Sequence, residues 1–226
     1  MSIPTTNYLP AIELETGAHP THTILWLHGL GADGNDFVPI VQELELPFAA
    51  AIRFIFPHAP EQSVTINSGL VMRAWYDIKH INLKRHEDET GIRHSQQAIA
   101  ALIERENQRG VPSANIILAG FSQGGVMALH VGLRYPYRLA GIIALSAYLP
   151  LTHTFTPEAQ VANTSTPIFM GHGSDDPIVP IQLARTSKEL LIGAGYPVEW
   201  HEYRMGHSVC DEEIAEISIW LGQVIR

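Results

Sequence analysis

The sequence predicts an α/β fold in which helices cover both faces of a mostly parallel, twisted sheet. Short apolar runs alternate with longer segments of helical period, which is the pattern of parallel strands joined by crossover helices. The composition is 46% hydrophobic and 16% charged, so much of the chain is expected to be interior. A length of 226 residues suits one such domain, and no linker or repeat divides it. We therefore expect residues 1–226 to form a single domain.

The individual elements follow from the period of the apolar residues. Asp211 and Glu212 stand where the last helix should begin and complement its dipole, whereas Gly193 and Gly195 end the helix before it. The polar stretch Lys79–Thr90 is expected to be a surface loop, with a mobile cap as the alternative. The expected strands are Thr23–His28, Ile52–Phe56, Asn115–Ala119, Ala140–Leu145, Pro167–Met170 and Val198–Tyr203. The expected helices are Gly91–Gln108, Gln123–Arg134, Ile181–Gly193 and Val209–Val224.

Charge and cysteine content exclude several classes of function. The formal net charge of −9 repels phosphate backbones, so we expect no nucleic acid partner. The first residues lack a basic segment followed by an apolar one, and no run approaches the roughly 18 apolar residues of a membrane span. The one cysteine, Cys210, cannot form an internal disulfide or a cysteine-rich metal cage. A cytoplasmic location without stable membrane insertion is the expectation.

A candidate nucleophile lies in the pentapeptide Gly120-Phe-Ser-Gln-Gly124, between the most strand-like run of the chain and a predicted helix. A strand, a sharp turn and a helix are the setting in which the serine of G-x-S-x-G, here Ser122, acts as a nucleophile. Such a turn strains the backbone and leaves room only for glycine-sized residues two positions to either side. The alternative is a serine that merely caps the helix, so the prediction depends on partners for Ser122.

A candidate acid follows at the end of a later predicted strand. In α/β-hydrolases the nucleophile, the acid and the base occur in that order along the chain. The segment Gly171–Pro177 holds two adjacent carboxylates, Asp175 and Asp176, at the end of the strand. Each could also serve only as a turn residue before the proline. We favour Asp176, with Asp175 as its competitor.

His207 is the candidate base, because it lies on the connection into the last predicted helix. His201 falls within a predicted strand, and His172 precedes the acid, so neither fits the third position of the order as well. His207 would take the proton of Ser122 and return it to the leaving group. Asp176 would fix the imidazole tautomer and stabilise the imidazolium.

The loop His28–Gly34, with the sequence HGLGADG, resembles loops that donate a backbone N–H to an oxyanion. We expect the backbone N–H groups of Leu30 and Gln123 to form this oxyanion hole, while their side chains matter less. The same loop contains G-x-G-x-x-G, which fits a dinucleotide fingerprint. That fingerprint requires an acidic residue about 20 positions further on, and the segment Ile52–His58 contains none. The nucleotide-dependent alternative is therefore disfavoured.

Four blocks in order, LHGLGADG, GFSQGG, HGSDDPIVP and RMGHSVC, resemble the carboxylesterase and acyl-protein thioesterase family, also called the phospholipase/carboxylesterase family. A further segment that ends in Trp75-Tyr-Asp77 is similar to that family as well, so the resemblance covers almost the whole chain. It implies the α/β-hydrolase fold without a large separate lid domain, and no cofactor. It also implies the triad Ser122, Asp176 and His207, which decides against Asp175.

The activity implied by the resemblance is that of a serine esterase or thioesterase that forms an acyl-enzyme on Ser122, with a lysophospholipase as the alternative. Its partner would be a small-molecule ester or an acylated lipid or protein, and a weak homodimer is compatible with apolar rims around an acyl groove. Trp75 and Val179 are expected to bind substrate, although an aromatic pair such as Trp75-Tyr76 is more often core. The histidines show no metal-ligand spacing, so we expect no metal.

Overall fold

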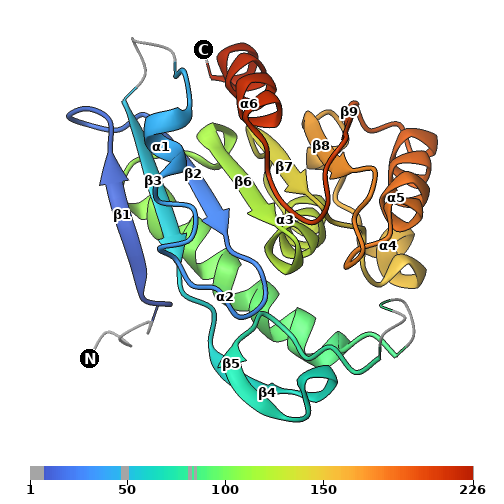
Figure 1. Ribbon diagram of the computed structural model, residues 1–226. Coiled ribbons are helices and arrows are strands. Elements are labelled where there is room, and N and C mark those ends of the chain that lie inside the picture. The colour runs from blue at the N-terminus through green and yellow to red at the C-terminus, as the bar shows by residue number, and fades with distance from the viewer. Residues whose placement is uncertain (1–7, 47–50, 81–82, 84–85, 226) are drawn as a thin grey trace.

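The computed structural model describes residues 8–46, 51–80, 83 and 86–225. Within these residues, a twisted sheet of seven strands has the order β1-β3-β2-β6-β7-β8-β9 (Figure 1). β1 pairs antiparallel to β3, whereas all other neighbours in this sheet are parallel. A separate antiparallel hairpin, β4-β5, projects beyond the lower edge of the sheet in Figure 1. The strands are β1 Ala11–Glu15, β2 His22–Leu27, β3 Ile52–Pro57, β4 Glu61–Val64, β5 Leu70–Arg73, β6 Ile116–Phe121, β7 Gly141–Leu145, β8 Ile168–Gly173 and β9 Val198–Tyr203.

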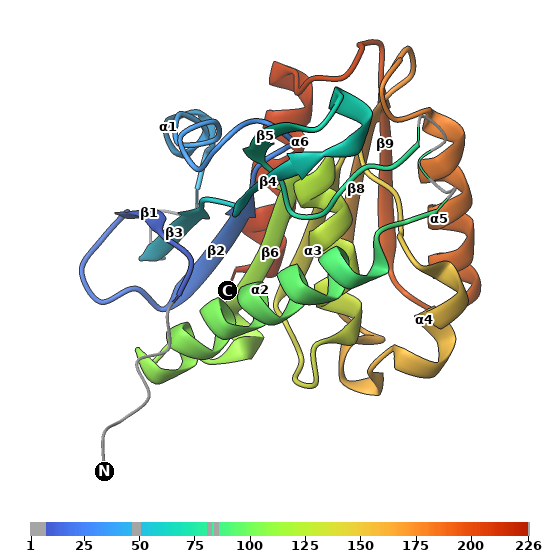
Figure 2. The same ribbon diagram turned by 90° about the horizontal axis from the view of Figure 1, so that it is seen from below.

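Helices lie on both faces of the sheet (Figure 2). α1 and α6 lie on one face, and α2 and α3 lie on the other. The α-helices are α1 Ile40–Glu43, α2 Glu89–Gln108, α3 Gln123–Arg134, α4 Thr152–Glu158, α5 Ile181–Gly193 and α6 Asp211–Val224. Short 3-10 helices are η1 Thr65–Asn67, η2 Ser113–Asn115 and η3 Val161–Asn163.

The two faces of the sheet bury two separate apolar clusters. Along β2, the side chains alternate between them: Ile24 packs in the cluster that includes residues of α1 and α6. Leu25 and Leu27 pack in the cluster that includes residues of α2 and α3. Because both faces are covered, the central parallel strands β6 and β7 are continuous apolar runs, which is the property that made them recognisable. The predicted α/β-hydrolase architecture, without a large separate domain, is confirmed.

The order of the strands determines where a site can form. β2 has β3 on one side and β6 on the other, so the chain changes its direction of travel across the sheet at β2. Ligands bind outside the carboxyl ends of parallel strands at such a switch point, because the two following loops diverge there. Leu27 at the end of β2 pairs with Gly120 of β6. The loop after β2 therefore begins beside the turn after β6.

Several element boundaries differ from those that the sequence predicted. β2 ends at Leu27, so His28 begins the loop, and β8 continues to Gly173, so His172 lies within a strand. The structure adds β1, the hairpin β4-β5, α1 and α4, which were not predicted. Their sequences mix polar and apolar residues over only four to seven positions, too few for a clear period. The stretch Lys79–Thr90 connects the hairpin region to α2, which begins at Glu89, and residues 81–82 and 84–85 of it lie outside the described ranges.

Candidate active site

Ser122 lies in a strained turn between β6 and α3. Its backbone has φ 54° and ψ −121°, a conformation with positive φ that non-glycine residues seldom adopt. Two hydrogen bonds hold the turn: the N–H of Ser122 donates to the carbonyl of Leu145 over 2.8 Å, and the N–H of Val126 donates to the carbonyl of Ser122 over 3.0 Å. The turn lifts the hydroxyl group above the carboxyl end of the sheet.

Three glycines permit this turn because of the close approach of the backbone around them. A Cβ on Gly120 would lie 2.4 Å from backbone atoms of Gly124. A Cβ on Gly124 would lie 2.1 Å from the carbonyl oxygen of Leu27, and one on Gly125 would lie 2.8 Å from the carbonyl oxygen of Gly120. Real side chains do not tolerate such distances, so glycine is required on steric grounds.

A chain of two hydrogen bonds joins Ser122, His207 and Asp176. The Ser122 Oγ lies 2.8 Å from the His207 Nε2, and the His207 Nδ1 lies 2.7 Å from the Asp176 Oδ2. The Asp176 side chain is fully buried, and its Oδ1 accepts hydrogen bonds from the backbone N–H groups of Ile178 and Val179 over 2.8 and 2.9 Å. These two donors fix the plane of the carboxylate, so that its other oxygen points at the imidazole. This is the geometry that activates a serine hydroxyl for nucleophilic attack.

The two candidate carboxylates occupy different environments. Asp175 is exposed, and its Oδ2 accepts a hydrogen bond from the hydroxyl group of Ser174. Asp176, by contrast, is the carboxylate that bonds to His207. The sequence positions of the two residues left the choice between them open. In the structure they differ in burial, and only the buried Asp176 bonds to His207.

His172 lies beside Asp176, and no feature of the sequence indicated this. Its Nε2 donates to the carbonyl of Val179 over 2.8 Å and lies 3.4 Å from the Asp176 Oδ2. The residue is completely buried, and burial lowers the pKa of its imidazole. A neutral His172 therefore supports the loop that carries Asp176. It was missed because a histidine in an apolar strand has no distinctive spacing.

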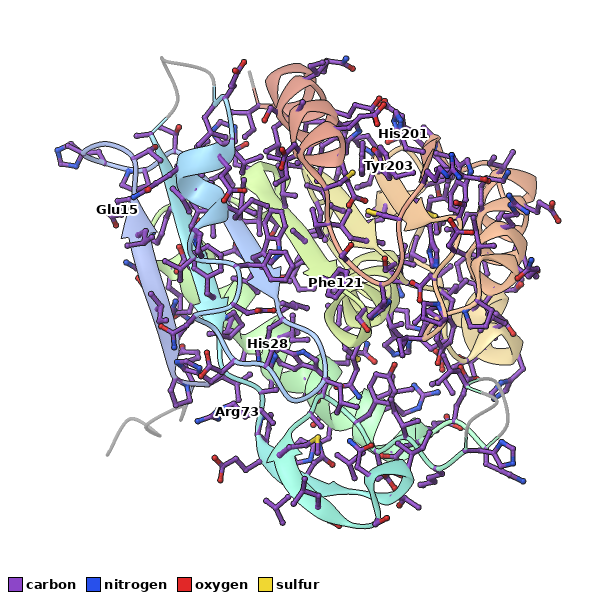
Figure 3. The ribbon with its side chains drawn as sticks, viewed as in Figure 1. Glu15, His28, Arg73, Phe121, His201 and Tyr203 are labelled. Carbon is purple, nitrogen blue, oxygen red and sulfur yellow. The ribbon has the colours of Figure 1, made fainter. Side chains whose placement is uncertain are left out.

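The loop after β2 reaches the same end of the sheet, where Figure 3 shows His28 and Phe121. The His28 Nδ1 donates to the carbonyl of Gly29 over 2.7 Å, and its Nε2 accepts from the N–H of Ala59 over 3.0 Å. Burial lowers the pKa of His28, which agrees with this neutral tautomer. A Cβ on Gly29 would lie 3.5 Å from the Cβ of Ser122, so the loop passes close to the serine.

The backbone N–H groups of Leu30 and Gln123 both belong to this region. Among the described residues, neither N–H group donates to a protein atom. Gln123 is the first residue of α3, and the first N–H groups of a helix have no partner within the helix. Unpaired donors near a candidate nucleophile can bind a developing negative charge, and the helix N-terminus at Gln123 favours such binding.

The side chains of Trp75 and Gln123 are buried, with exposed fractions of 1% and 3%. The Trp75 indole N–H donates to the carbonyl of His28, and the Gln123 carboxamide bonds to the backbone at Trp75 and Tyr76. Val179 is also buried, and its backbone bonds to Asp176 and His172. That Trp75 and Val179 contact substrate stays a prediction.

The glycine-rich loop does not lead directly into a helix, as a dinucleotide fingerprint would, because α1 begins only at Ile40. A Cβ on Gly34 would lie 2.3 Å from the carbonyl oxygen of Phe56, so this glycine serves close packing against β3. No group of three His, Cys, Asp or Glu residues that could hold a metal ion occurs in the described part of the chain. The same part contains no helix with the length and apolar character needed to cross a membrane.

Comparison with known proteins agrees with this geometry. The model of the phospholipase/carboxylesterase family matches residues 10–225. Acyl-protein thioesterase 1 of Gibberella zeae is 40% identical over 210 residues, which cover 89% of each chain. Acyl-protein thioesterase 1 of Neurospora crassa is 40% identical over 222 residues, covering 94% of this chain and 90% of the relative.

Solved structures show the same similarity. Arabidopsis thaliana SOBER1 superposes with a TM-score of 0.86 at 31% identity, over 91% of this chain and 99% of that one. Zea mays acyl-protein thioesterase 2 superposes with a TM-score of 0.84 at 26% identity, over 97% of this chain and 100% of that one.

Fold and site together define a class, the serine hydrolases of the α/β type that act on esters or thioesters. Within that class, the chain belongs to the phospholipase/carboxylesterase family.

Proposed function

We propose that this enzyme hydrolyses the thioester bonds of S-acylated proteins through an acyl-enzyme on Ser122. The hydrogen-bonded chain from Ser122 through His207 to Asp176 carries the proposal for the chemistry. The similarity to acyl-protein thioesterases along most of the chain supports an acylated protein, in preference to a lysophospholipid, as the substrate.

In the first half of the proposed reaction, the Ser122 Oγ attacks the acyl carbonyl carbon. His207 Nε2 takes the proton of the hydroxyl group, and the Asp176 carboxylate stabilises the resulting imidazolium by accepting the hydrogen bond of Nδ1–H. When the tetrahedral intermediate collapses, the C–S bond breaks and His207 returns the proton to the leaving thiolate. The acyl group remains on Ser122 as an ester.

In the second half, water attacks the acyl ester, with His207 as the base. Collapse of the second intermediate breaks the acyl–Oγ bond, His207 returns the proton to Ser122 Oγ, and the carboxylic acid that leaves loses its own proton to solvent. The N–H groups of Leu30 and Gln123 are the proposed donors to the oxyanion in both halves, and loss of one such donor typically costs about 10²- to 10³-fold in kcat. The short distances from His207 to both partners support this assignment of roles.

The roles can be tested with a fluorophosphonate probe, which forms a stable adduct with an activated serine. Wild-type protein should gain one adduct, mapped to Ser122 by peptide mass spectrometry. Ser122→Ala should gain none, whereas Ser174→Ala, a change at an exposed serine of the Asp175 turn, should label like wild type. Labelling that persists in Ser122→Ala would overturn the assignment.

The substrate class requires a separate measurement. We would compare kcat/KM for an S-palmitoylated peptide, for the same peptide with an O-palmitoyl ester on serine, and for a lysophosphatidylcholine. The proposal predicts the highest value for the thioester peptide. A higher value for the lysophospholipid would make the enzyme a lysophospholipase, and the thioesterase proposal would then be wrong.

Three further proposals concern the context of the enzyme. One is that residues 1–226 form a single domain, which is supported by one sheet with strands drawn from residues 11–203. Another is a cytoplasmic location, in line with a cysteine, Cys210, that is free. The last is a weak homodimer. Limited proteolysis tests the single domain, and cell fractionation tests the location. Sedimentation at several protein concentrations tests the homodimer.

A further inference from the structure

The segment Arg73–Tyr76, which begins at the last residue of β5, is hydrogen-bonded to the proposed oxyanion loop. The N–H of Gly31 donates to the carbonyl of Arg73 over 2.9 Å. The indole N–H of Trp75 donates to the carbonyl of His28, also over 2.9 Å. Figure 3 shows Arg73 and His28 in the same part of the molecule, toward the hairpin. One bond on each side of Leu30, at His28 and at Gly31, therefore ties its loop to this segment.

The same segment is bonded to the turn that carries the nucleophile. The N–H of Trp75 donates to the Gln123 Oε1 over 2.8 Å, and the Gln123 Nε2 donates to the carbonyl of Tyr76 over 2.7 Å. The carboxamide of Gln123 thus satisfies a donor and an acceptor on neighbouring residues. Because Gln123 directly follows Ser122, this pair of bonds links the segment to the first turn of α3.

In the described part of the chain, the hydrogen bonds between the strands of the sheet stop short of both proposed oxyanion donors. The ladder between β2 and β6 ends at the pair Leu27 and Gly120, before either proposed donor. Beyond it, the loop is joined to the turn through the segment Arg73–Tyr76. Three of the four bonds are made by buried residues, with Trp75 1%, Gln123 3% and His28 1% exposed. The fourth joins the exposed Gly31 to the half-buried Arg73. Buried polar groups keep their partners because water cannot replace them.

We propose that the side chains of Gln123 and Trp75 are positioning residues that set the separation between the backbone N–H groups of Leu30 and Gln123. The inference rests on the proposed function. Oxyanion donors must lie 2.7–3.1 Å from the oxygen that they stabilise, and a displacement of about 1 Å costs roughly 100-fold in rate. Trp75 thereby acts on the proposed oxyanion hole through His28.

The test uses variants that remove the bridge and keep both backbone donors. Trp75→Phe removes the indole N–H and keeps an aromatic ring, whereas Gln123→Met removes both carboxamide bonds at similar length. Trp220→Phe is the matched control, because Trp220 is equally buried but lies against Gly141 at the start of β7. Thermal unfolding of each variant identifies any loss of folding, and Gln123→Met carries the test if Trp75→Phe does not fold.

We expect Trp75→Phe and Gln123→Met to lower kcat by about 10- to 100-fold with little change in KM, because the bridge serves the transition state. A trifluoromethyl ketone, whose adduct with the serine carries an oxyanion, should bind more weakly by about the same factor. An unreactive ether analogue of the substrate should bind to the variants with the same affinity as to the wild-type enzyme. The double variant should lose about as much as the worse single variant, since both remove one bridge.

The outcomes separate this inference from the proposed function. If both single variants keep kcat and ketone affinity within about twofold of Trp220→Phe, the bridge has no positioning role. If ether and ketone affinities fall together, the role is in binding, and the inference is also wrong. Failure of the proposed function would instead appear as turnover that persists in Ser122→Ala, whatever the bridge variants do.

Discussion

The ring of Phe121 packs against the ring of His207, with centroids 4.7 Å apart and planes inclined by 44°. Phe121 also packs against Phe37, which stacks on the buried ring of Trp26, at centroid distances of 5.8 and 5.3 Å. This row of rings connects the apolar cluster on the α1 and α6 face of the sheet to His207, the proposed base. Phe121 is the variable residue before the serine of G-x-S-x-G, and its side chain contacts His207, the proposed base.

We predict that Phe121→Leu lowers kcat/KM by about three- to tenfold. An aromatic contact contributes about 0.5–1.5 kcal/mol beyond the area that it buries, and a π face also attracts the imidazolium that forms during attack. Steady-state hydrolysis of a p-nitrophenyl ester measures the effect. Phe121→Tyr keeps the ring and should stay within about twofold of wild type, whereas full activity in Phe121→Leu would show that the contact is only structural.

Gly124→Ala should strongly destabilise the protein, because the new Cβ would lie 2.1 Å from the carbonyl oxygen of Leu27. Overpacking typically costs about 1–3 kcal/mol, and a contact with backbone is harder to relieve than one with a side chain. The matched control is Gly222→Ala within α6, where a Cβ meets no atom within 4 Å. That change should raise the free energy of unfolding by about 0.5–1 kcal/mol. Urea denaturation distinguishes the two, and equal stabilities would contradict the prediction.

His130 should make the protein less stable in acid. It is completely buried, and burial lowers its pKa from 6.5 to about 3. Between these values the unfolded chain binds a proton that the folded protein does not, so the free energy of unfolding falls as the pH drops from 6.5 toward 3. The loss should reach a few kcal/mol by pH 4, at about 1.4 kcal/mol per pKa unit.

Urea denaturation at several pH values between 4 and 7 measures this loss. His130→Gln should flatten the dependence, because glutamine does not titrate. His153→Gln, at a side chain that is 67% exposed, should leave the dependence unchanged. A slope that is the same in wild type and His130→Gln would mean that His130 does not titrate as proposed.

Glu213 should have the opposite effect on pH dependence. It is completely buried in α6, and neither carboxylate oxygen has a hydrogen-bond partner among the described residues. Burial, with a smaller effect of Glu216, raises its pKa from 4.5 to about 8. The folded protein therefore keeps a proton that the unfolded chain loses, and this contribution to stability is present below pH 4.5 and is lost as the pH rises toward 8.

Glu213→Gln should consequently be more stable than wild type at pH 8, and the difference between the two should shrink toward pH 5. The measurement is urea denaturation across this range. Glu212→Gln, at the exposed neighbouring position, should behave as wild type. A difference that does not change with pH would indicate that Glu213 stays in one protonation state.

The long elements were predictable because their signals are local. The buried strand Ile116–Phe121 is a continuous apolar run, and α3 and α6 carry the helical period over 12 and 14 residues. The edge strand Ala11–Glu15 and the hairpin β4-β5 were not predictable in this way. Their residues are partly exposed and partly polar, and a strand of that kind is defined by its partner more than by its own sequence.

By itself, the sequence determined the class of fold and the family, and it predicted Ser122, Asp176 and His207 as the catalytic residues in that order, because a strand-turn-helix motif and its glycines are encoded in adjacent residues. The tertiary structure alone decided what surrounds them. The carboxamide of Gln123 reaches the backbone of Trp75, 48 positions away, and His172 lies beside Asp176 from within a strand. Neither contact leaves a periodic or spaced signal in one sequence: the first joins distant residues, and the second depends on the turn that follows β8. Both therefore appear only when the chain has folded.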